Sequence, residues 1–173
     1  MHQHKLPDVL APNLRLIFVG TAAGRRSAEV GAYYAHPGNR FWLTLHEIGL
    51  TPRRYQPHEF RDLLTLGIGF TDMSKLGSGM DHEIAADQFD VSRFVETIRH
   101  YRPRAIAFTS KRAAAVWLGK STTSEIAFGR QQARPADFPE VFVLPSPSGA
   151  AGATWIIGPW RDLAEWLRST PHT

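Results

Sequence analysis

Three polar side chains in this sequence could bind or activate a water molecule. Asp72 ends the apolar segment Gly67–Asp72, where a carboxylate could orient water or, when protonated, donate a hydrogen bond to a carbonyl oxygen. Asn39 could hold a water through its amide, and His36 lies close to it in a His-Pro-Gly-Asn turn. Each side chain also has a structural explanation, with Asp72 and Asn39 as caps and His36 as a hydrogen-bonded turn residue. The candidate catalytic residues are therefore Asp72, Asn39 and His36.

Aromatic side chains crowd the same turn, in the block Tyr33–Trp42. An exposed ring at Tyr34 could stack on a planar base, because stacking needs only an accessible ring face. The alternative is that both tyrosines and Trp42 belong to the core or its rim. The block indicates a binding surface only if further residues converge on it.

The segment Gly20–Gly24 is a loop of small residues that directly follows an apolar run. Its glycines and alanines let the backbone approach a ligand closely, with N–H groups available to donate. It is not a phosphate-binding P-loop, because the Lys-Ser/Thr pair that should follow is missing. A tight strand-to-helix turn would have the same composition, so this loop alone does not define a site.

A second loop, Leu144–Gly152, contains two prolines followed by small residues. Prolines stiffen a loop, and a stiff loop can enter a DNA groove and hold a bent backbone. Taken alone, the loop is equally well explained as a surface turn.

Short apolar strands alternate with helical patterns along the chain, which predicts an α/β fold with a parallel sheet and helices on both faces. In such folds ligands bind at the carboxyl ends of the strands. The segment Gly77–Asp87 is rich in glycine and charge and is expected to be irregular. The expected strands are Leu14–Gly20, Gly67–Asp72, Arg104–Thr109 and Glu140–Leu144. The expected helices are Asn39–Ile48, Pro57–Leu66, Val91–Tyr101, Lys111–Leu118 and Pro159–Arg168.

Composition narrows the class of protein. A length of 173 residues suits one domain, 1–173, and the absence of cysteine excludes disulfides, thiolate zinc sites and iron–sulfur clusters. No apolar run could span a membrane and no signal peptide is evident, so we expect a cytoplasmic protein. The histidines form no metal-binding pattern, which predicts neither metal nor cofactor. A net charge of +4 with basic pairs such as Arg25–Arg26, Arg53–Arg54 and Lys111–Arg112 favours a polyanionic partner if the pairs converge.

The order of three motifs is more specific than any motif alone. The chain carries Gly20-Thr21-Ala22-Ala23-Gly24, then Ala35-His36-Pro37-Gly38-Asn39-Arg40-Phe41-Trp42, then Pro145-Ser146-Pro147-Ser148-Gly149. This order resembles the mismatch-specific uracil/thymine-DNA glycosylases, a branch of the uracil-DNA glycosylase superfamily, which carry G-I-N-P-G, A-H-P-x-N-R-F-W and N-P-S-G-L-S. The resemblance implies a three-layer α/β/α sandwich with a central, mainly parallel four-stranded sheet.

The resemblance also implies a pocket that receives a base flipped out of DNA. The implied base-binding residues are Gly20, Thr21, Ala22, Ala23, Tyr34 and Phe70. The implied DNA-intercalation loop comprises Ser146, Pro147, Ser148, Gly149, Ala150 and Ala151.

The sequence departs from the resembled family at residues that carry chemistry. Ala22 replaces the asparagine that positions water, and Ala150 replaces the leucine that fills the gap left by a flipped base. Ala23 and Ser146 replace a further proline and asparagine. Asp72 is the leading substitute for the lost asparagine. We expect a smooth, enlarged pocket that accepts uracil and also hypoxanthine or xanthine.

The resulting expectation is a monomeric, monofunctional DNA glycosylase of base excision repair, because no lysine has a recognisable activating partner for Schiff-base chemistry. One alternative is a non-catalytic protein that binds damaged or abasic DNA. Another is an N-glycosidase acting on free nucleosides or nucleotides with the same scaffold.

Overall fold

Four parallel strands and one short antiparallel strand form the central sheet. The computed structural model describes residues 6–74 and 89–170. The sheet order is β2-β1-β3-β5-β4, with β1 at Leu16–Gly20 and β2 at Ile68–Asp72. The strands β3 (Ala105–Phe108) and β5 (Glu140–Val143) continue it in parallel, and β4 (Gly129–Arg130) pairs antiparallel with β5. The α/β prediction is confirmed, with β4 as an addition because two residues are too few to leave a sequence pattern.

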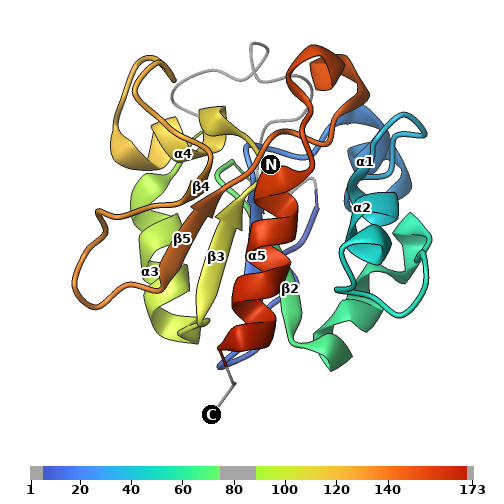
Figure 1. Cartoon of the computed structure of the whole chain (residues 1–173), viewed down its shortest axis with the longest axis horizontal. Coiled ribbons are helices and arrows are strands. Elements are labelled where there is room, and N and C mark those ends of the chain that lie inside the picture. The colour runs from blue at the N-terminus through green and yellow to red at the C-terminus, as the bar shows by residue number, and fades with distance from the viewer. Residues whose placement is uncertain (1–5, 75–88, 171–173) are drawn as a thin grey trace, which may run out of the picture.

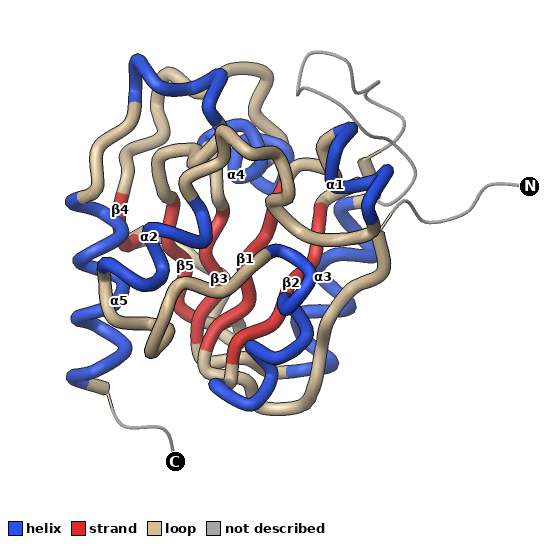
Figure 2. Tube along the Cα trace, turned by 90° about the vertical axis from the view of Figure 1, so that its right-hand side faces the viewer, coloured by secondary structure: helices blue, strands red, loops and turns tan. Residues whose placement is uncertain are grey.

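Helices cover both faces of the sheet (Figures 1 and 2). Alternate residues of β1 pack on opposite faces, as the two-residue period of a strand requires. Leu16 and Phe18 join the cluster that includes α2 and α5, whereas Ile17 and Val19 join the cluster that includes α3 and α4. The helical segments are α1 (Arg25–Val30), α2 (Phe41–Glu47), η1 (Pro57–Leu66), α3 (Val91–Tyr101), α4 (Lys111–Leu118), η4 (Gly149–Thr154) and α5 (Gly158–Ser169).

The helix predictions hold where an apolar face repeats and fail where none exists. The bounds of α3 and α4 match the prediction, and Asp90 and Ser110 cap them by accepting the amides of Arg93 and Ala113. The segment Pro57–Leu66 is a 3₁₀ helix rather than an α-helix. The helix α1 and the 3₁₀ segment η4 were not predicted, because neither has an apolar stripe.

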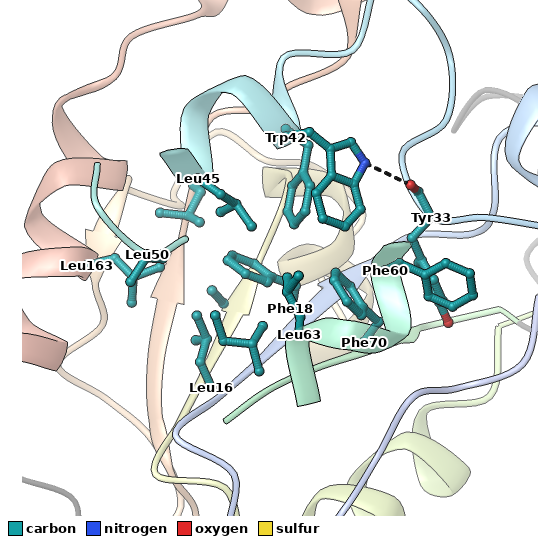
Figure 3. Close-up of a cluster of buried hydrophobic side chains, with 14 of the residues drawn as sticks. Leu16, Phe18, Tyr33, Trp42, Leu45, Leu50, Phe60, Leu63, Phe70 and Leu163 are labelled. Atoms are coloured by element: carbon teal, nitrogen blue, oxygen red, sulfur yellow. Dashed lines mark hydrogen bonds between the residues drawn. The ribbon is translucent and has the colours of Figure 1, made fainter. Parts of the chain in front are cut away.

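One face of the sheet carries a large aromatic cluster, drawn in part in Figure 3. The ring of Phe18 lies 4.9 Å from Phe41 and 5.9 Å from Trp160, so β1, α2 and α5 meet at one point. Trp42 donates its indole N–H to the carbonyl of Tyr33 at 3.1 Å, a bond visible in Figure 3. This bond fixes the turn before α2 to the helix that follows it.

The N-terminal segment runs along the outer edge of β2. Val9 and Phe70 exchange two backbone hydrogen bonds of 2.9 and 2.8 Å, and Gly69 makes this approach possible, since a Cβ there would lie 2.4 Å from the Val9 carbonyl. The edge of β2 is thereby covered just before its carboxyl end. The predicted irregular segment Gly77–Asp87 lies outside the described residues. In residues 6–74 and 89–170, no helix is both long and apolar enough for a membrane span.

Candidate active site

A cavity of about 480 Å³ opens at the carboxyl edge of the sheet. Loops that follow β1, β3 and β5 contribute to it, together with Asp72 at the end of β2, as expected for a parallel α/β sheet. The structure brings together most of the residues that the sequence singled out. The predicted residues that line the cavity are Gly20, Thr21, Ala22, Ala23, Tyr34, His36, Asn39, Asp72, Ser146, Pro147, Ser148, Ala150 and Ala151.

Two predicted residues do not line it. Phe70 is fully buried, and its ring stacks against Tyr33 at 4.9 Å. It shares a strand face with Asp72 but lies two residues deeper, so Tyr33 rather than Phe70 reaches the cavity. Gly149 instead approaches Gly38, since a Cβ on Gly149 would lie 3.0 Å from the Gly38 carbonyl oxygen.

Asp72 is a buried carboxylate on the cavity wall, with only 3% of its surface exposed. It pairs with Gly20 across β1 and β2, and a Cβ on Gly20 would lie 2.6 Å from its Oδ1. Burial, followed by the charge of Asp72, raises the pKa of both Tyr33 and Tyr34 well above the usual value for a phenol. Both tyrosines therefore stay neutral beside the carboxylate at physiological pH.

The backbone of Asp72 is held by a polar frame. Arg93, in the first turn of α3, donates from Nη2 to the Asp72 carbonyl at 2.7 Å. Its Nη1 lies 3.8 Å from Asp8, and Asp8 also accepts a 2.8 Å hydrogen bond from the hydroxyl of Thr71. The N-terminal segment, α3 and β2 thus together fix the backbone position from which the Asp72 side chain projects.

Tyr34 forms a fixed aromatic wall. Its backbone takes the uncommon left-handed conformation, with φ of 51°, and its ring stacks on Phe41 at 4.0 Å. Its hydroxyl lies 3.0 Å from Thr109 Oγ1, which itself donates to the carbonyl of Val19 at 3.3 Å. Because the Thr109 proton is committed to Val19, Tyr34 is the donor to Thr109. One ring face is covered by Phe41, and the ring contributes to the cavity wall.

Asn39 and His36 serve the turn and also line the cavity. Asn39 Oδ1 accepts the amide of Phe41 at 2.9 Å, but the N-cap position of α2 expected for Asn39 is occupied by Arg40, one residue later. His36 Nδ1 accepts the amide of Gly38 at 2.9 Å. These bonds leave the Asn39 amide nitrogen and His36 Nε2 as the groups that could meet a ligand.

The His-Pro-Gly-Asn turn and the proline-rich loop form one wall. The amide of Arg40 donates to the Pro147 carbonyl at 2.8 Å, next to the close approach of Gly38 and Gly149. The guanidinium of Arg40 lies 5.5 Å from the ring of Trp155, and its Nη1 is buried with no hydrogen-bond partner among the described residues. Arg40 therefore supports the loop that contains η4.

Sequence reasoning did not single out several residues of the cavity. Thr109 and Ser110 come from the end of β3, and Ser110 Oγ lies 3.3 Å from Thr21 Oγ1 while it caps α4. The N-cap position before Lys111–Leu118 was the available signal for Ser110. Arg25 and Arg26, which the sequence singled out only as a basic pair, also line the cavity from the start of α1. The described residues contain no group of three or more His, Cys, Asp or Glu side chains arranged to hold a metal ion.

Comparisons with known proteins agree on one family. Residues 7–164 match the family model described as the uracil DNA glycosylase superfamily. The solution NMR structure of a Methanosarcina acetivorans protein, described as a candidate uracil DNA glycosylase, matches with a TM-score of 0.62. The two sequences are 25% identical, and the match covers 97% of this chain and 99% of the other.

Proposed function

The chain belongs to the uracil DNA glycosylase superfamily, and from that membership we propose that it excises uracil, hypoxanthine and xanthine from DNA by hydrolysing the N-glycosidic bond. The observation that carries the proposal is the buried carboxylate of Asp72 in the wall of a cavity that also holds Tyr34. The block Ala35–Trp42 further favours kinship with the mismatch-specific branch.

Size and shape support a flipped base as the ligand. A cavity of about 480 Å³ falls within the range typical of small-molecule sites. Tyr34 is held by Phe41 and Thr109 before any ligand arrives, so stacking on its ring needs little reorganisation. Ala22 projects no polar group into the cavity, which leaves space for a purine as well as a pyrimidine.

Asp72 supplies the group that the first motif lacks. In the proposed reaction, the bond between the base nitrogen and C1′ breaks and its electron pair leaves with the base. The buried carboxylate stabilises the positive charge that develops on the sugar. A water oriented by Asp72 attacks C1′ and gives up a proton to the carboxylate. Transfer of that proton to the departing base anion restores Asp72 and leaves an abasic sugar and a free base.

Several residues would assist without taking a proton. The Asn39 amide nitrogen could hold the water from the side opposite Asp72, because its oxygen is committed to Phe41. The hydroxyls of Thr21 and Ser110 can donate to or accept from the base edge. No lysine lines the cavity in the part of the chain that the structure describes, which supports a monofunctional glycosylase over a lyase.

A non-catalytic binder of abasic DNA is the second candidate, favoured by Ala150. Its side chain is exposed at the start of η4, where the resembled family has a leucine, and it is too short to fill a vacated base stack. A protein that lost both this wedge and the first-motif asparagine could keep affinity for an abasic site without turnover.

Base excision from oligonucleotides tests the proposal. Duplex and single-stranded substrates would carry uracil, thymine opposite guanine, hypoxanthine or xanthine, and free nucleosides would be assayed alongside. Wild type should excise several deaminated bases from DNA but not from nucleosides. Asp72→Asn should abolish excision while retaining the fold, and Asn39→Ala should reduce it.

Other outcomes of the same assays would assign a different catalytic residue or a different function. Activity that survives in Asp72→Asn but is lost in Asn39→Ala would transfer the water-holding role to the turn. Strict excision of uracil alone would contradict the broad pocket. Tight binding to an abasic duplex with no excision of any base would identify a binder, and cleavage of nucleosides would indicate a small-molecule N-glycosidase.

A further inference from the structure

Two of the three basic pairs noted in the sequence converge on the cavity edge of the sheet. Arg25–Arg26 begins α1 and Lys111–Arg112 begins α4, and both helices start from the loops after parallel strands (Figures 1 and 2). Arg53, from the third pair, is instead bound to Glu59 through two hydrogen bonds of 3.0 and 2.6 Å. The convergence that the sequence left open is therefore present at this edge.

The two pairs at that edge differ in what they contact. Lys111 Nζ lies 4.4 Å from the ring centre of Phe128, and Arg112 lies 5.5 Å from that of Phe89, so both cations rest on aromatic faces. Neither belongs to the cavity wall, whereas Arg25 and Arg26 both do. The cations of α4 thus lie outside the cavity wall, whereas the cations of α1 form part of it.

Arg26 is exposed and has no hydrogen bond or ion pair within residues 6–74 and 89–170. The first turn of α1 contains no acidic residue that could neutralise it. An exposed guanidinium is usually a solvated surface group, but this one borders a cavity whose buried end is occupied by Asp72. The cavity is therefore polarised, with a carboxylate in its depth and a cation at its mouth.

Among the described residues that line the cavity, the wall formed by the His-Pro-Gly-Asn turn and the proline-rich loop contributes no lysine or arginine side chain. The hydroxyl oxygens of Ser146 and Ser148 accept the amides of Ser148 and Ala150, both at 3.3 Å. His36 Nδ1 accepts the Gly38 amide at 2.9 Å and is thereby engaged within the turn. A ligand with an anionic end therefore has one favourable orientation, with that end toward α1.

We propose that Arg26, supported by the charge of Arg25, binds a DNA backbone phosphate next to the nucleotide whose base enters the cavity. This inference rests on the proposed function only in taking DNA as the ligand. A guanidinium can donate two parallel hydrogen bonds to phosphate oxygens, which fixes register as well as adding affinity. The contact would compensate for the small side chain at Ala150, because it holds the backbone in the flipped geometry from outside the base stack.

The test is the salt dependence of binding to a duplex that contains a tetrahydrofuran abasic-site analogue, measured by fluorescence anisotropy between about 50 and 200 mM KCl. Removal of one phosphate contact in Arg26→Gln should make the negative slope of log K against log salt shallower by about 0.9. Affinity should fall roughly tenfold at the lower salt concentration, as expected for one charge-assisted contact. Arg26→Lys should keep the wild-type slope and lose part of the affinity, because it keeps the charge without the two-pronged geometry.

Arg102→Gln provides the matched control. Arg102 is an exposed arginine at the C-terminal end of α3, just before β3 begins and so at the sheet edge opposite the cavity. Its slope and affinity should equal those of wild type. A slope in Arg26→Gln equal to that of Arg102→Gln would overturn the proposal. Wild type that excises no base but shows the Arg26-dependent slope would refute the glycosylase assignment and leave the phosphate contact standing.

Discussion

The carboxylate of Asp72 occupies the space that a side chain on Gly20 of the neighbouring strand would need. The two residues are register partners, and a Cβ on Gly20 would lie 2.6 Å from Asp72 Oδ1, well inside van der Waals contact. Glycine is needed here because of this close approach and not because of an unusual backbone angle. The missing side chain is what allows a carboxylate at the end of β2 to occupy the cavity wall.

Gly20→Ala should therefore displace Asp72 and reduce base excision by about a hundredfold, because small misplacements of a catalytic group have effects of that size. The free energy of unfolding should fall by about 1–3 kcal/mol as the added methyl group overpacks the site. Excision rates and urea unfolding would measure the two effects. Gly158→Ala is the control, since a Cβ there meets nothing within 4 Å, and an equal loss in both variants would contradict the contact.

The Tyr34–Thr109 hydrogen bond should couple the two residues energetically. Tyr34→Phe and Thr109→Val each remove the same 3.0 Å bond, so either change should lower the free energy of unfolding by about 1 kcal/mol. The double variant should lose less than the sum of the two single changes. Chemical denaturation of all four proteins gives the coupling energy, and simple additivity would show that the bond contributes nothing.

Replacement of Arg93 should lower stability and base excision more than replacement of Arg99, which lies on the same helix. Arg93 donates to the carbonyl of Asp72, whereas Arg99 forms an exposed ion pair with Asp137 at 3.4 Å. Arg93→Met should reduce stability by about 1–3 kcal/mol and lower excision, while Arg99→Met should change stability by less than about 1 kcal/mol. Equal thermal shifts in the two variants would argue against a role for Arg93 in fixing Asp72.

Alkaline pH should destabilise the protein through its buried phenols. Burial and, second, the charge of Asp72 raise the pKa of Tyr33 and Tyr34 in the folded state. A raised folded-state pKa gives stability that is fully present below the unfolded value of about 10 and is lost as pH rises beyond it. The melting temperature should therefore drop above about pH 10, and the double variant Tyr33→Phe/Tyr34→Phe should drop less steeply. Parallel pH profiles for the two proteins would refute this assignment.

How far the sequence predicts the structure depends on whether a signal is local. The apolar run around Phe18 and the strand-end position of Asp72 are local, and both were predicted correctly. Phe70 shares a face with Asp72, but its depth is set by the ring of Tyr33, which comes from a distant part of the chain. The two-residue period of a strand predicts which face of the sheet a side chain occupies, but not how far it lies from the cavity. Phe70 was therefore wrongly placed in the pocket.

Contacts between loops likewise could not be predicted from sequence patterns. The bond from the Arg40 amide to the Pro147 carbonyl joins two motifs that are far apart in the chain. Neither α1 nor η4 has an apolar period, so the helix that carries Arg26 had no sequence signature. The motif order predicted which residues assemble, and tertiary contacts determined how they face one another.

The backbone contact between Gly38 and Gly149 has a consequence for building chimeras. Any side chain introduced at position 149 would meet the Gly38 carbonyl, at 3.0 Å for its first carbon, so a donor loop brought in alone must also carry glycine there. Arg40, which bonds the same loop, would have to accept the donor backbone as well. Exchange of lesion specificity between relatives should therefore succeed when residues 36–40 and 145–151 are transplanted together, as one cassette.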